Sequence, residues 1–236
     1  GRSRDRNSVA GRHRSASTSW IIWRESLSDK RKYISNMKQD KNEIRWDKLL
    51  HIQTMGRDDS NSDQYRYPYE PTPYSVLERL ANTGYIRKNN TLLDYGCGKG
   101  RVDFFLSYQT RCRSIGIEYD ERIYQKAVEN KDKAVSGGRT SMELANAEIF
   151  AVPENADRMY FFNPFSVEIL EKVMARILES YYQNPRAIQL FFYYPSDEYI
   201  SYLMTIDELM FVDEISCNDL FPGQDPRERI VIFEMS

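Results

Sequence analysis

Residues 92–101 place an acid, a cysteine and three alternating glycines at the end of a short apolar run. They read Leu-Leu-Asp-Tyr-Gly-Cys-Gly-Lys-Gly-Arg, with glycines at positions 96, 98 and 100, and an amphipathic helical pattern follows. A glycine has no Cβ, so a chain rich in glycine can turn sharply and approach a bound ligand closely. A strand, a glycine-rich turn and a helix N-terminus in this order form the first unit of a nucleotide-binding, doubly wound fold.

Two common phosphate-binding patterns do not fit this turn. The dinucleotide fingerprint needs Gly-x-Gly-x-x-Gly, and the bulky Arg101 stands where its third glycine permits close helix packing. A P-loop needs Ser or Thr after its lysine, whereas Gly100 follows Lys99. We therefore expect neither an NAD-linked oxidoreductase nor a P-loop nucleotidase.

Polar side chains also follow the next three predicted strands. Glu118 ends the second strand, 24 residues after Asp94. In dinucleotide-binding folds an acid about 20 residues further on accepts the ribose hydroxyls. Asn146 follows the third predicted strand, and Asn163-Pro164-Phe165 follows the fourth.

These four elements, in this order, resemble the class I S-adenosylmethionine-dependent methyltransferases across roughly residues 65–195. The resemblance implies S-adenosyl-L-methionine as the cofactor. Asp94 would face its amino-acid end and Glu118 its ribose, while Asn146 stands where many family members have an aspartate that contacts the adenine amine. The implied cofactor-binding residues are Asp94, Gly96, Cys97, Gly98, Gly100, Glu118, Tyr119, Asn146 and Ala147.

The Asn163-Pro164-Phe165 turn bears on the methyl acceptor. It resembles the Asn/Asp-Pro-Pro-Tyr/Phe turn of family members that methylate nitrogen, although it has one proline instead of two. The resemblance implies that Asn163, Pro164 and Phe165 align a nitrogen for in-line attack, a step that positioning accelerates strongly. The other interpretation is a buried strand that a proline ends, with Phe161, Phe162 and Phe165 in the core.

The elements that must position these residues alternate between strand and helix. Five such units followed by a terminal hairpin predict an α/β, doubly wound, mostly parallel seven-stranded sheet, with helices on both faces and a C-terminal antiparallel hairpin. Strands are expected at 91–95, 113–118, 141–145, 157–162, 187–194, 209–215 and 229–233. Helices are expected at 100–108, 121–135, 167–182 and 196–204.

A segment with a different pattern precedes the first strand. We expect a helix over 43–55, a polar loop over 56–63, an extended stretch over 64–74 and a helix over 74–81. The extended stretch contains a cluster of tyrosines (Tyr65, Tyr67, Tyr69 and Tyr74). Family members use such an arm to cover the cofactor, and the alternative is an arm packed on the sheet edge. Tyr193-Tyr194-Pro195 falls on the predicted acceptor side.

Charge divides the chain at about residue 36. Residues 1–36 carry nine Lys/Arg and three acids, which leaves 24 basic and 32 acidic residues, a formal charge of −8, in 37–236. The basic head is expected to be a non-native or processed stretch, a targeting presequence or a nucleic-acid arm, and Met37 is a plausible initiator. An acidic body is a poor host for nucleic acid, since phosphate neutralisation supplies much of that affinity.

Composition excludes several other classes. Three cysteines with no CxxC spacing argue against a disulfide framework and a zinc site, and with only two histidines we expect no metal. The longest apolar run, 187–194, has the length of a strand, so we expect no membrane span. A reducing, cytoplasmic location fits best.

The sequence thus predicts a basic head (1–36), a helical and extended arm (37–90) and a methyltransferase domain (91–236). The expected activity is N-methylation of a protein or small-molecule acceptor, with nucleic acid less favoured. The alternative is a non-catalytic methyltransferase-like module that binds the cofactor or another partner.

Overall fold

The computed structural model describes residues 36–58, 66 and 69–236. Most of the basic head, part of the predicted polar loop, and Tyr65 and Tyr67 therefore lie outside the described residues. Their expected roles stay predictions, as does the division of the chain at residue 90.

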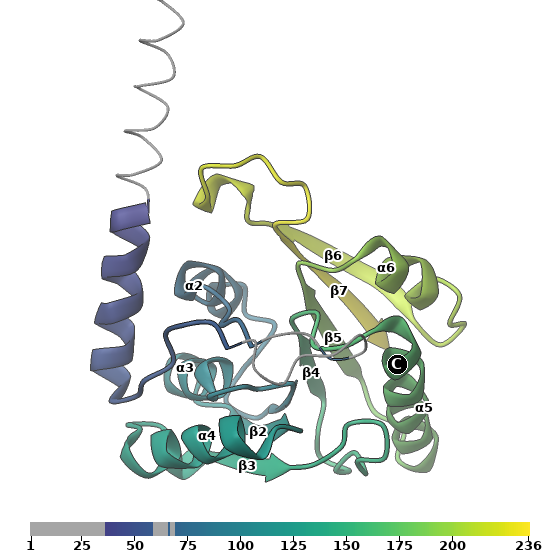
Figure 1. Ribbon diagram of the computed structural model, residues 1–236. Helices are drawn as coiled ribbons and strands as arrows, with labels where there is room; N and C mark the ends of the chain where they lie inside the picture. Colours follow the sequence, from purple (N-terminus) through teal and green to yellow (C-terminus); the bar gives the residue numbers. More distant parts are fainter. Residues whose placement is uncertain (1–35, 59–65, 67–68) are drawn as a thin grey trace, which may run out of the picture.

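A seven-stranded sheet forms the centre of the molecule (Figure 1). Its strands are β1 (Thr91–Tyr95), β2 (Arg113–Glu118), β3 (Thr140–Leu144), β4 (Arg158–Phe161), β5 (Ile188–Tyr193), β6 (Met210–Ser216) and β7 (Arg229–Met235). The spatial order is β3-β2-β1-β4-β5-β7-β6. The first five strands pair in parallel, and β7 pairs antiparallel with both β5 and β6. The predicted fold class is confirmed.

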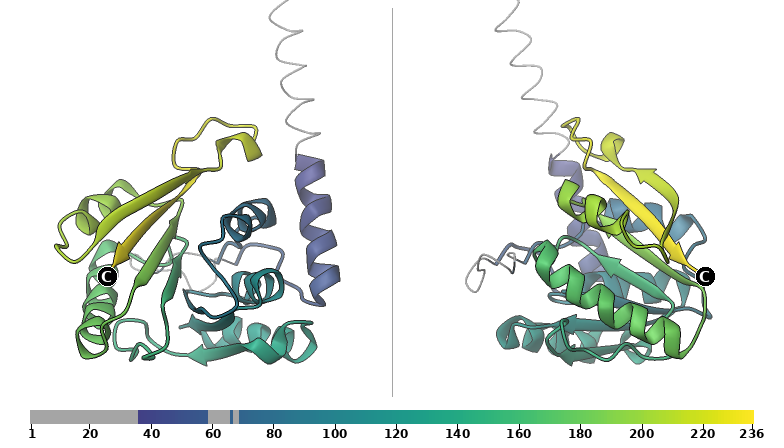
Figure 2. Two further views of the ribbon diagram at one scale, coloured as in Figure 1. Left: turned by 180° about the vertical axis from the view of Figure 1, so that it is seen from behind. Right: turned by 90° about the vertical axis from the view of Figure 1, so that its right-hand side faces the viewer.

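Helices cover both faces of this sheet (Figures 1 and 2). Residues 36–50 form the N-terminal helix, and the other helices are α2 (Tyr74–Asn82), α3 (Arg101–Thr110), α4 (Glu121–Lys133), α5 (Val167–Gln183) and α6 (Asp197–Leu203). Two short 3₁₀ turns, η1 (Gly137–Arg139) and η2 (Asn218–Leu220), lie in connections. The views place α2, α3 and α4 on one face and α5 and α6 on the other.

The alternation of side chains along each strand divides the core into two layers. On β5, Phe191 and Tyr193 pack with the layer under α2 and α3, whereas Leu190 and Phe192 pack with the layer under α5. Successive side chains of a strand point to opposite faces, so a central strand covered on both sides must be apolar throughout. This is why 187–194 is the longest apolar run of the chain.

The N-terminal helix ends at residue 50, five residues before the predicted end. His51 has a left-handed backbone with φ +60°. Its N–H donates to Lys48 O at 3.3 Å, and the Ile52 N–H donates to Asp47 O at 2.9 Å. These two bonds form a Schellman motif, which satisfies the last carbonyls and turns the chain back. Apolar periodicity continued past this point because Ile52 is also buried.

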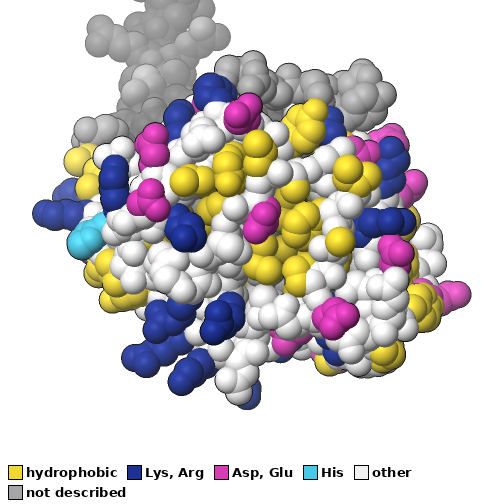
Figure 3. All heavy atoms as spheres, turned by 90° about the horizontal axis from the view of Figure 1, so that it is seen from below, with side chains coloured by type: hydrophobic (Ala, Val, Ile, Leu, Met, Phe, Trp, Pro, Cys, Tyr) yellow, Lys and Arg dark blue, Asp and Glu magenta, His cyan; other side chains and the backbone are white. Residues whose placement is uncertain are grey.

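The sheet order changes direction beside β1, since β2 lies on one side and β4 on the other. In doubly wound sheets, ligands bind in the crevice at such a point, outside the carboxyl ends of the strands. The connection over residues 145–157 contains no helix, and its side chains Ala145, Ala147, Phe150 and Val152 are only partly buried. Seen from below Figure 1, on the side of β3 and α4, hydrophobic side chains form a patch among charged ones (Figure 3). No helix of the described residues is long and apolar enough to cross a bilayer.

Candidate functional site

A pocket of about 1000 Å³ opens where the carboxyl ends of β1, β2 and β4 meet. Nine of the predicted site residues line this large pocket: Asp94, Gly96, Cys97, Glu118, Tyr119, Asn146, Ala147, Pro164 and Phe165. Gly98, Gly100 and Asn163 are not among its lining residues. The sequence spacing therefore brings together side chains from four separate strand ends.

The glycine turn adopts a conformation that only glycine takes easily. Gly96 and Gly98 have φ of +73° and +58°, and a Cβ on Gly96 would lie 2.6 Å from the Cβ of Pro164. A Cβ on Gly98 would overlap the ring of Tyr69. Gly100 is different, because its missing Cβ faces Phe104 in the core, so its role is to let α3 pack.

Glu118 holds the glycine turn from the end of β2. One carboxylate oxygen accepts from the Gly98 N–H, and the other accepts from the N–H groups of Tyr119 and Asp120, each at 2.9 Å. Burial raises the pKa of Glu118, while these three backbone bonds oppose the rise. A carboxylate offers about four acceptor positions. The oxygen that Gly98 occupies once can therefore still accept a ligand hydroxyl.

Asp94 and Asp103 form a buried carboxyl pair beneath the turn. Asp94 is the last residue but one of β1 and Asp103 comes from the first turn of α3, and both side chains are buried. Burial raises the pKa of Asp94 well above its ordinary value, and the neighbouring Asp103 adds to the rise. Burial raises the pKa of Asp103 to about 7. Asp94 Oδ2 has no hydrogen-bond partner among the described residues. Burial and the neighbouring carboxyl thus make this pair hold a proton to a higher pH than an exposed aspartate does.

Cys97 fills space beside this pair. It is 6% exposed, and burial raises the pKa of its thiol far above the ordinary value. Its Sγ lies against the backbone of Gly116, where a Cβ would have to fit. A protonated, buried thiol is a poor nucleophile, which supports a packing role.

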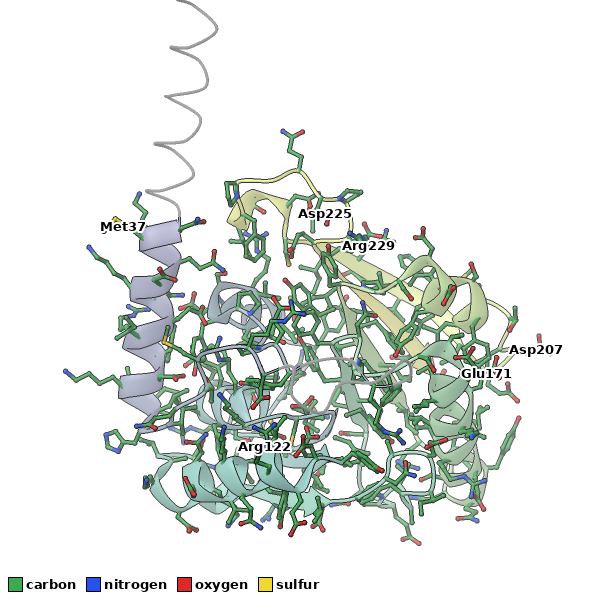
Figure 4. All side chains as sticks on the ribbon, in the orientation of Figure 1. Met37, Arg122, Glu171, Asp207, Asp225 and Arg229 are labelled. Carbon is green, nitrogen blue, oxygen red and sulfur yellow. The ribbon has the colours of Figure 1, made fainter. Side chains whose placement is uncertain are left out.

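Three polar side chains close the pocket mouth. Arg66 lies with its guanidinium 4.1 Å from the ring centroid of Tyr119 and bonds Glu148 at 3.1 Å. Asn146 Oδ1 accepts from the Glu148 N–H at 3.0 Å. The expected contact of this oxygen with an adenine amine would therefore use its second lone pair. Arg122, labelled in Figure 4, pairs with Asp58 at 2.8 Å on the same side.

In the Asn163-Pro164-Phe165 turn the phenylalanine lies in the core, while the role of the turn in aligning an acceptor stays a prediction. Phe165 is 5% exposed and packs against Phe161, as a core residue would. Asn163 has a strained φ of +38°, and its Nδ2 donates to the carbonyl of Tyr194 at 2.6 Å. Its Oδ1 is buried without a partner among the described residues. Asn163 lines a second cavity of about 470 Å³, next to the large pocket.

The arm before α2 reaches the same place. Tyr69 packs on Gly98, and its hydroxyl donates to Thr54 O at 2.6 Å. Thr72 lines the large pocket and shares a hydrogen bond with the Tyr160 hydroxyl at 2.9 Å. Tyr74 does not face the pocket, because it begins α2 and is fully buried. Tyr69 thus lies beside the pocket and Tyr74 lies in the core, and the covering of the cofactor by the arm stays a prediction.

Arg101, which rules out the dinucleotide fingerprint, fastens the N-terminal helix to the site. Its guanidinium pairs with Glu43, donates to Thr54 Oγ1 at 2.7 Å and lies over the ring of Tyr74 at 4.3 Å. It is 2% exposed. Burial raises the pKa of Glu43, and the adjacent Arg101 opposes that rise.

Sequence reasoning missed Asp103, Tyr160 and Glu70, which all belong to these two cavities or their floor. Asp103 gave a usable signal, since it is an acid inside the otherwise apolar run 102–106. Glu70 gave none, because a charged residue in an extended polar segment is ordinary.

The arrangement suits a nucleoside with an ammonium group better than a metal. Glu118 and Asp94 supply acceptors to the large pocket, and Gly96 and Cys97 line it beside them. No group of three or more metal-ligating side chains occurs among the described residues. Seven of the lining residues would hold the cofactor, namely Asp94, Gly96, Cys97, Glu118, Tyr119, Asn146 and Ala147.

Comparisons with known proteins agree with this architecture. No protein-family model matches the chain. A protein-lysine N-methyltransferase of Saccharolobus islandicus is 28% identical over 80 residues, which span 34% of this chain and 50% of that relative. Thus the match extends over about half the length of the curated relative.

Two solved structures are similar over most of the chain. A protein of the NADB-Rossmann superfamily from Streptococcus agalactiae has a TM-score of 0.52 and 19% identity, covering 71% of this chain and 70% of its own. A TehB-like SAM-dependent methyltransferase from Corynebacterium glutamicum has a TM-score of 0.51 and 16% identity, covering 85% of this chain and 100% of its own. Together with the strand order, these likenesses show that the chain has the Rossmann-like fold of the class I S-adenosylmethionine-dependent methyltransferases.

Proposed function

We propose that the chain transfers the methyl group of S-adenosyl-L-methionine to a nitrogen of a protein or small-molecule acceptor. The observation that carries the proposal is the large pocket, in which Gly96 and Cys97 of the glycine turn lie beside the acceptors of Glu118 and Asp94. When bound, the cofactor supplies an electrophilic methyl group on a sulfonium. The protein then needs to bind the cofactor and the acceptor, orient them for attack and exclude water, without redox chemistry of its own.

Each lining residue has a part in this proposal. Glu118 binds a ribose hydroxyl through the oxygen that keeps a free lone pair, and Tyr119 flanks the base. The uncovered main chain of Gly96 and Cys97 lies along the amino-acid end. Asp94 accepts a hydrogen bond from the ammonium, which favours loss of the proton that it shares with Asp103.

The acceptor side is formed by Asn163, Pro164 and Phe165. Pro164 packs directly on Gly96, so the acceptor turn and the cofactor turn are in contact. This contact supports a reaction at their junction. The printed name of the curated relative, a protein-lysine N-methyltransferase, favours a protein acceptor. The formal charge of −8 in residues 37–236 disfavours nucleic acid.

A non-catalytic module is the second candidate. The single proline after Asn163 and the asparagine at position 146 are the observations that favour it. Cofactor binding without transfer to any acceptor would support this candidate, whereas labelled methyl transfer would eliminate it. We also propose a cytoplasmic location, which the three free, buried cysteines favour.

Isothermal titration calorimetry with S-adenosylhomocysteine tests the proposal. We expect the full chain to bind this product, and Glu118→Gln to bind about 10- to 100-fold more weakly, because a hydrogen bond to a charged group contributes roughly 1.5–3 kcal/mol. Glu129→Gln is the matched control, since Glu129 is exposed on α4 and outside the pocket. No binding by the full chain at millimolar ligand, or equal binding by Glu118→Gln, would contradict the proposal.

A further inference from the structure

The second cavity lies directly beside the large pocket, and the two share a wall. Phe162 and Glu70 line both cavities. The second cavity measures about 470 Å³ and is walled by the aromatic side chains of Tyr193, Tyr194 and Phe221 in addition to Phe162. Figure 4 labels Asp225, on the connection before β7, and Arg229, the first residue of β7, which lie a short distance before and after the lining residue Glu228 along the chain.

The polar groups of this cavity are mainly hydrogen-bond acceptors. Asn163 is oriented by its Nδ2 bond to Tyr194 O, and its buried Oδ1 has no partner among the described residues. Glu228 accepts from the Tyr193 hydroxyl at 2.6 Å through Oε2. That bond leaves Oε1 as a further acceptor. A buried carbonyl oxygen without a partner carries a desolvation cost that a ligand N–H would remove.

The charge of the cavity is acidic where these acceptors meet. Glu70 and Glu228 line it. Burial is the main cause that raises the pKa of Glu228, and the nearby Asp225 and Glu70 add to the rise. Arg57 is the cation of the lining, and Arg227 is paired with Asp225 at 3.3 Å. The lining therefore carries two carboxylates and one guanidinium.

We propose that the second cavity binds an aliphatic amine in its ammonium form, with Asn163 Oδ1 and Glu228 as acceptors and Phe162, Tyr193 and Tyr194 as the aromatic wall. This inference rests on the proposed methyltransferase function and specifies its acceptor. An ammonium has three N–H donors and no acceptor, which matches a site of acceptors. Aromatic faces add a favourable interaction with a cation.

A planar ring nitrogen of nucleic acid fits this cavity less well. It would bring phosphates toward Glu70 and Glu228, which repel them. A neutral ring nitrogen would also give the Glu228 carboxylate no positive charge to pair with, whereas an ammonium would.

The transfer step balances with the groups present. The ammonium loses one proton to the Glu228 carboxylate, and the neutral amine keeps its lone pair. That nitrogen attacks the methyl carbon, so an N–C bond forms while the C–S bond breaks. The sulfur keeps the bonding electrons and becomes a neutral thioether, and the amine leaves as a methylammonium.

An acceptor comparison tests the inference on the full chain. The donor is S-adenosylmethionine labelled in the methyl group, and the acceptors are poly-L-lysine, spermidine and total tRNA. We expect label in poly-L-lysine or spermidine at rates at least 10-fold above tRNA. Label mainly in tRNA would overturn the inference while leaving the methyltransferase function intact. Failure of the chain to bind S-adenosylhomocysteine would instead contradict the proposed function.

Variants then test the two acids. Glu70→Gln, at an exposed position, is expected to raise KM for the amine acceptor about 10-fold. Glu228→Gln can keep its bond to Tyr193 but cannot take the ammonium proton, so we expect it to raise KM about 10-fold and to lower kcat as well. The affinity for S-adenosylhomocysteine should stay within about 2-fold. Glu214→Gln on β6 is the control, because Glu214 pairs with Arg229 outside both cavities. Unchanged KM in both variants, or an equal rise in the control, would overturn the inference.

Discussion

At the scale of single residues, the Asp94–Asp103 pair makes stability depend on pH. Burial raises the pKa of Asp103 from 3.8 to about 7, and burial with the neighbouring Asp103 raises that of Asp94 well above its ordinary value. Between about pH 4 and pH 7 the folded protein keeps protons that the unfolded chain has released. The free energy of unfolding must therefore fall as the pH rises through this window, by up to about 1.4 kcal/mol per pH unit for each proton retained.

Replacing Asp103 by Asn should flatten this dependence, because the second carboxyl is removed and the pKa of Asp94 moves toward its ordinary value. Urea denaturation at pH 5, 6, 7 and 8 measures the effect. Asp132→Asn, at an exposed position of α4, should retain the slope of the natural sequence. Parallel curves for the natural sequence and Asp103→Asn would show that the pair does not share a proton.

At the scale of elements, buried ion pairs tie the N-terminal helix to α3. Arg101 pairs with Glu43 and lies 4.0 Å from Asp47, and its guanidinium also donates to Thr54 and Thr72. Glu43 and Arg101 are 9% and 2% exposed. Removing Glu43 takes the nearest carboxylate from a buried guanidinium, and breaking a buried pair costs about 3–5 kcal/mol. We expect Glu43→Ala to lower the free energy of unfolding by about 3 kcal/mol.

Chemical denaturation with tryptophan fluorescence can follow this loss, since Trp46 lies in the same helix. Asp40→Ala is the matched control, because Asp40 is an exposed acid of the same helix, and we expect a change within about 0.5 kcal/mol. A small effect of Glu43→Ala would mean that water reaches Arg101 and replaces the ion pair.

At the scale of the whole molecule, β7 contributes side chains to both core layers. It also connects the parallel part of the sheet, which ends at β5, to the edge strand β6. It lies between β5 and β6, with Ile232 in the layer under α2 and Phe233 in the layer under α5. Ile232 is fully buried. Truncation of a buried isoleucine removes hydrophobic contacts and leaves a cavity, so Ile232→Ala should cost about 3 kcal/mol.

Val212 supplies the comparison, since it is 39% exposed at the irregularity of β6 between Phe211 and Asp213. We expect Val212→Ala to change the urea midpoint by less than a third as much as Ile232→Ala. Equal effects would indicate that the last two strands contribute to stability as a hairpin alone and not by closing the core.

Much of the architecture follows from local pattern. The glycine turn, the acid at the end of β2 and the alternation of strand and helix are set by residues close in sequence, because turns need positive φ and buried strands need continuous apolar runs. Those features predicted the fold class and nine residues of the large pocket. The predicted end of the N-terminal helix was wrong. Apolar periodicity cannot distinguish a buried helical residue from one in a buried turn, such as Ile52.

The sequence by itself determined that a bare main-chain turn would meet an acid one crossover later, because both are local consequences of a parallel strand, helix and strand. Only the tertiary structure decided which distant groups join them. Asp103 beneath Asp94, Arg101 held by Glu43, and Glu228 beside Asn163 are brought together by packing between elements. Burial and charge then set their pKa values and pairing, and neither is encoded in any single segment of the chain.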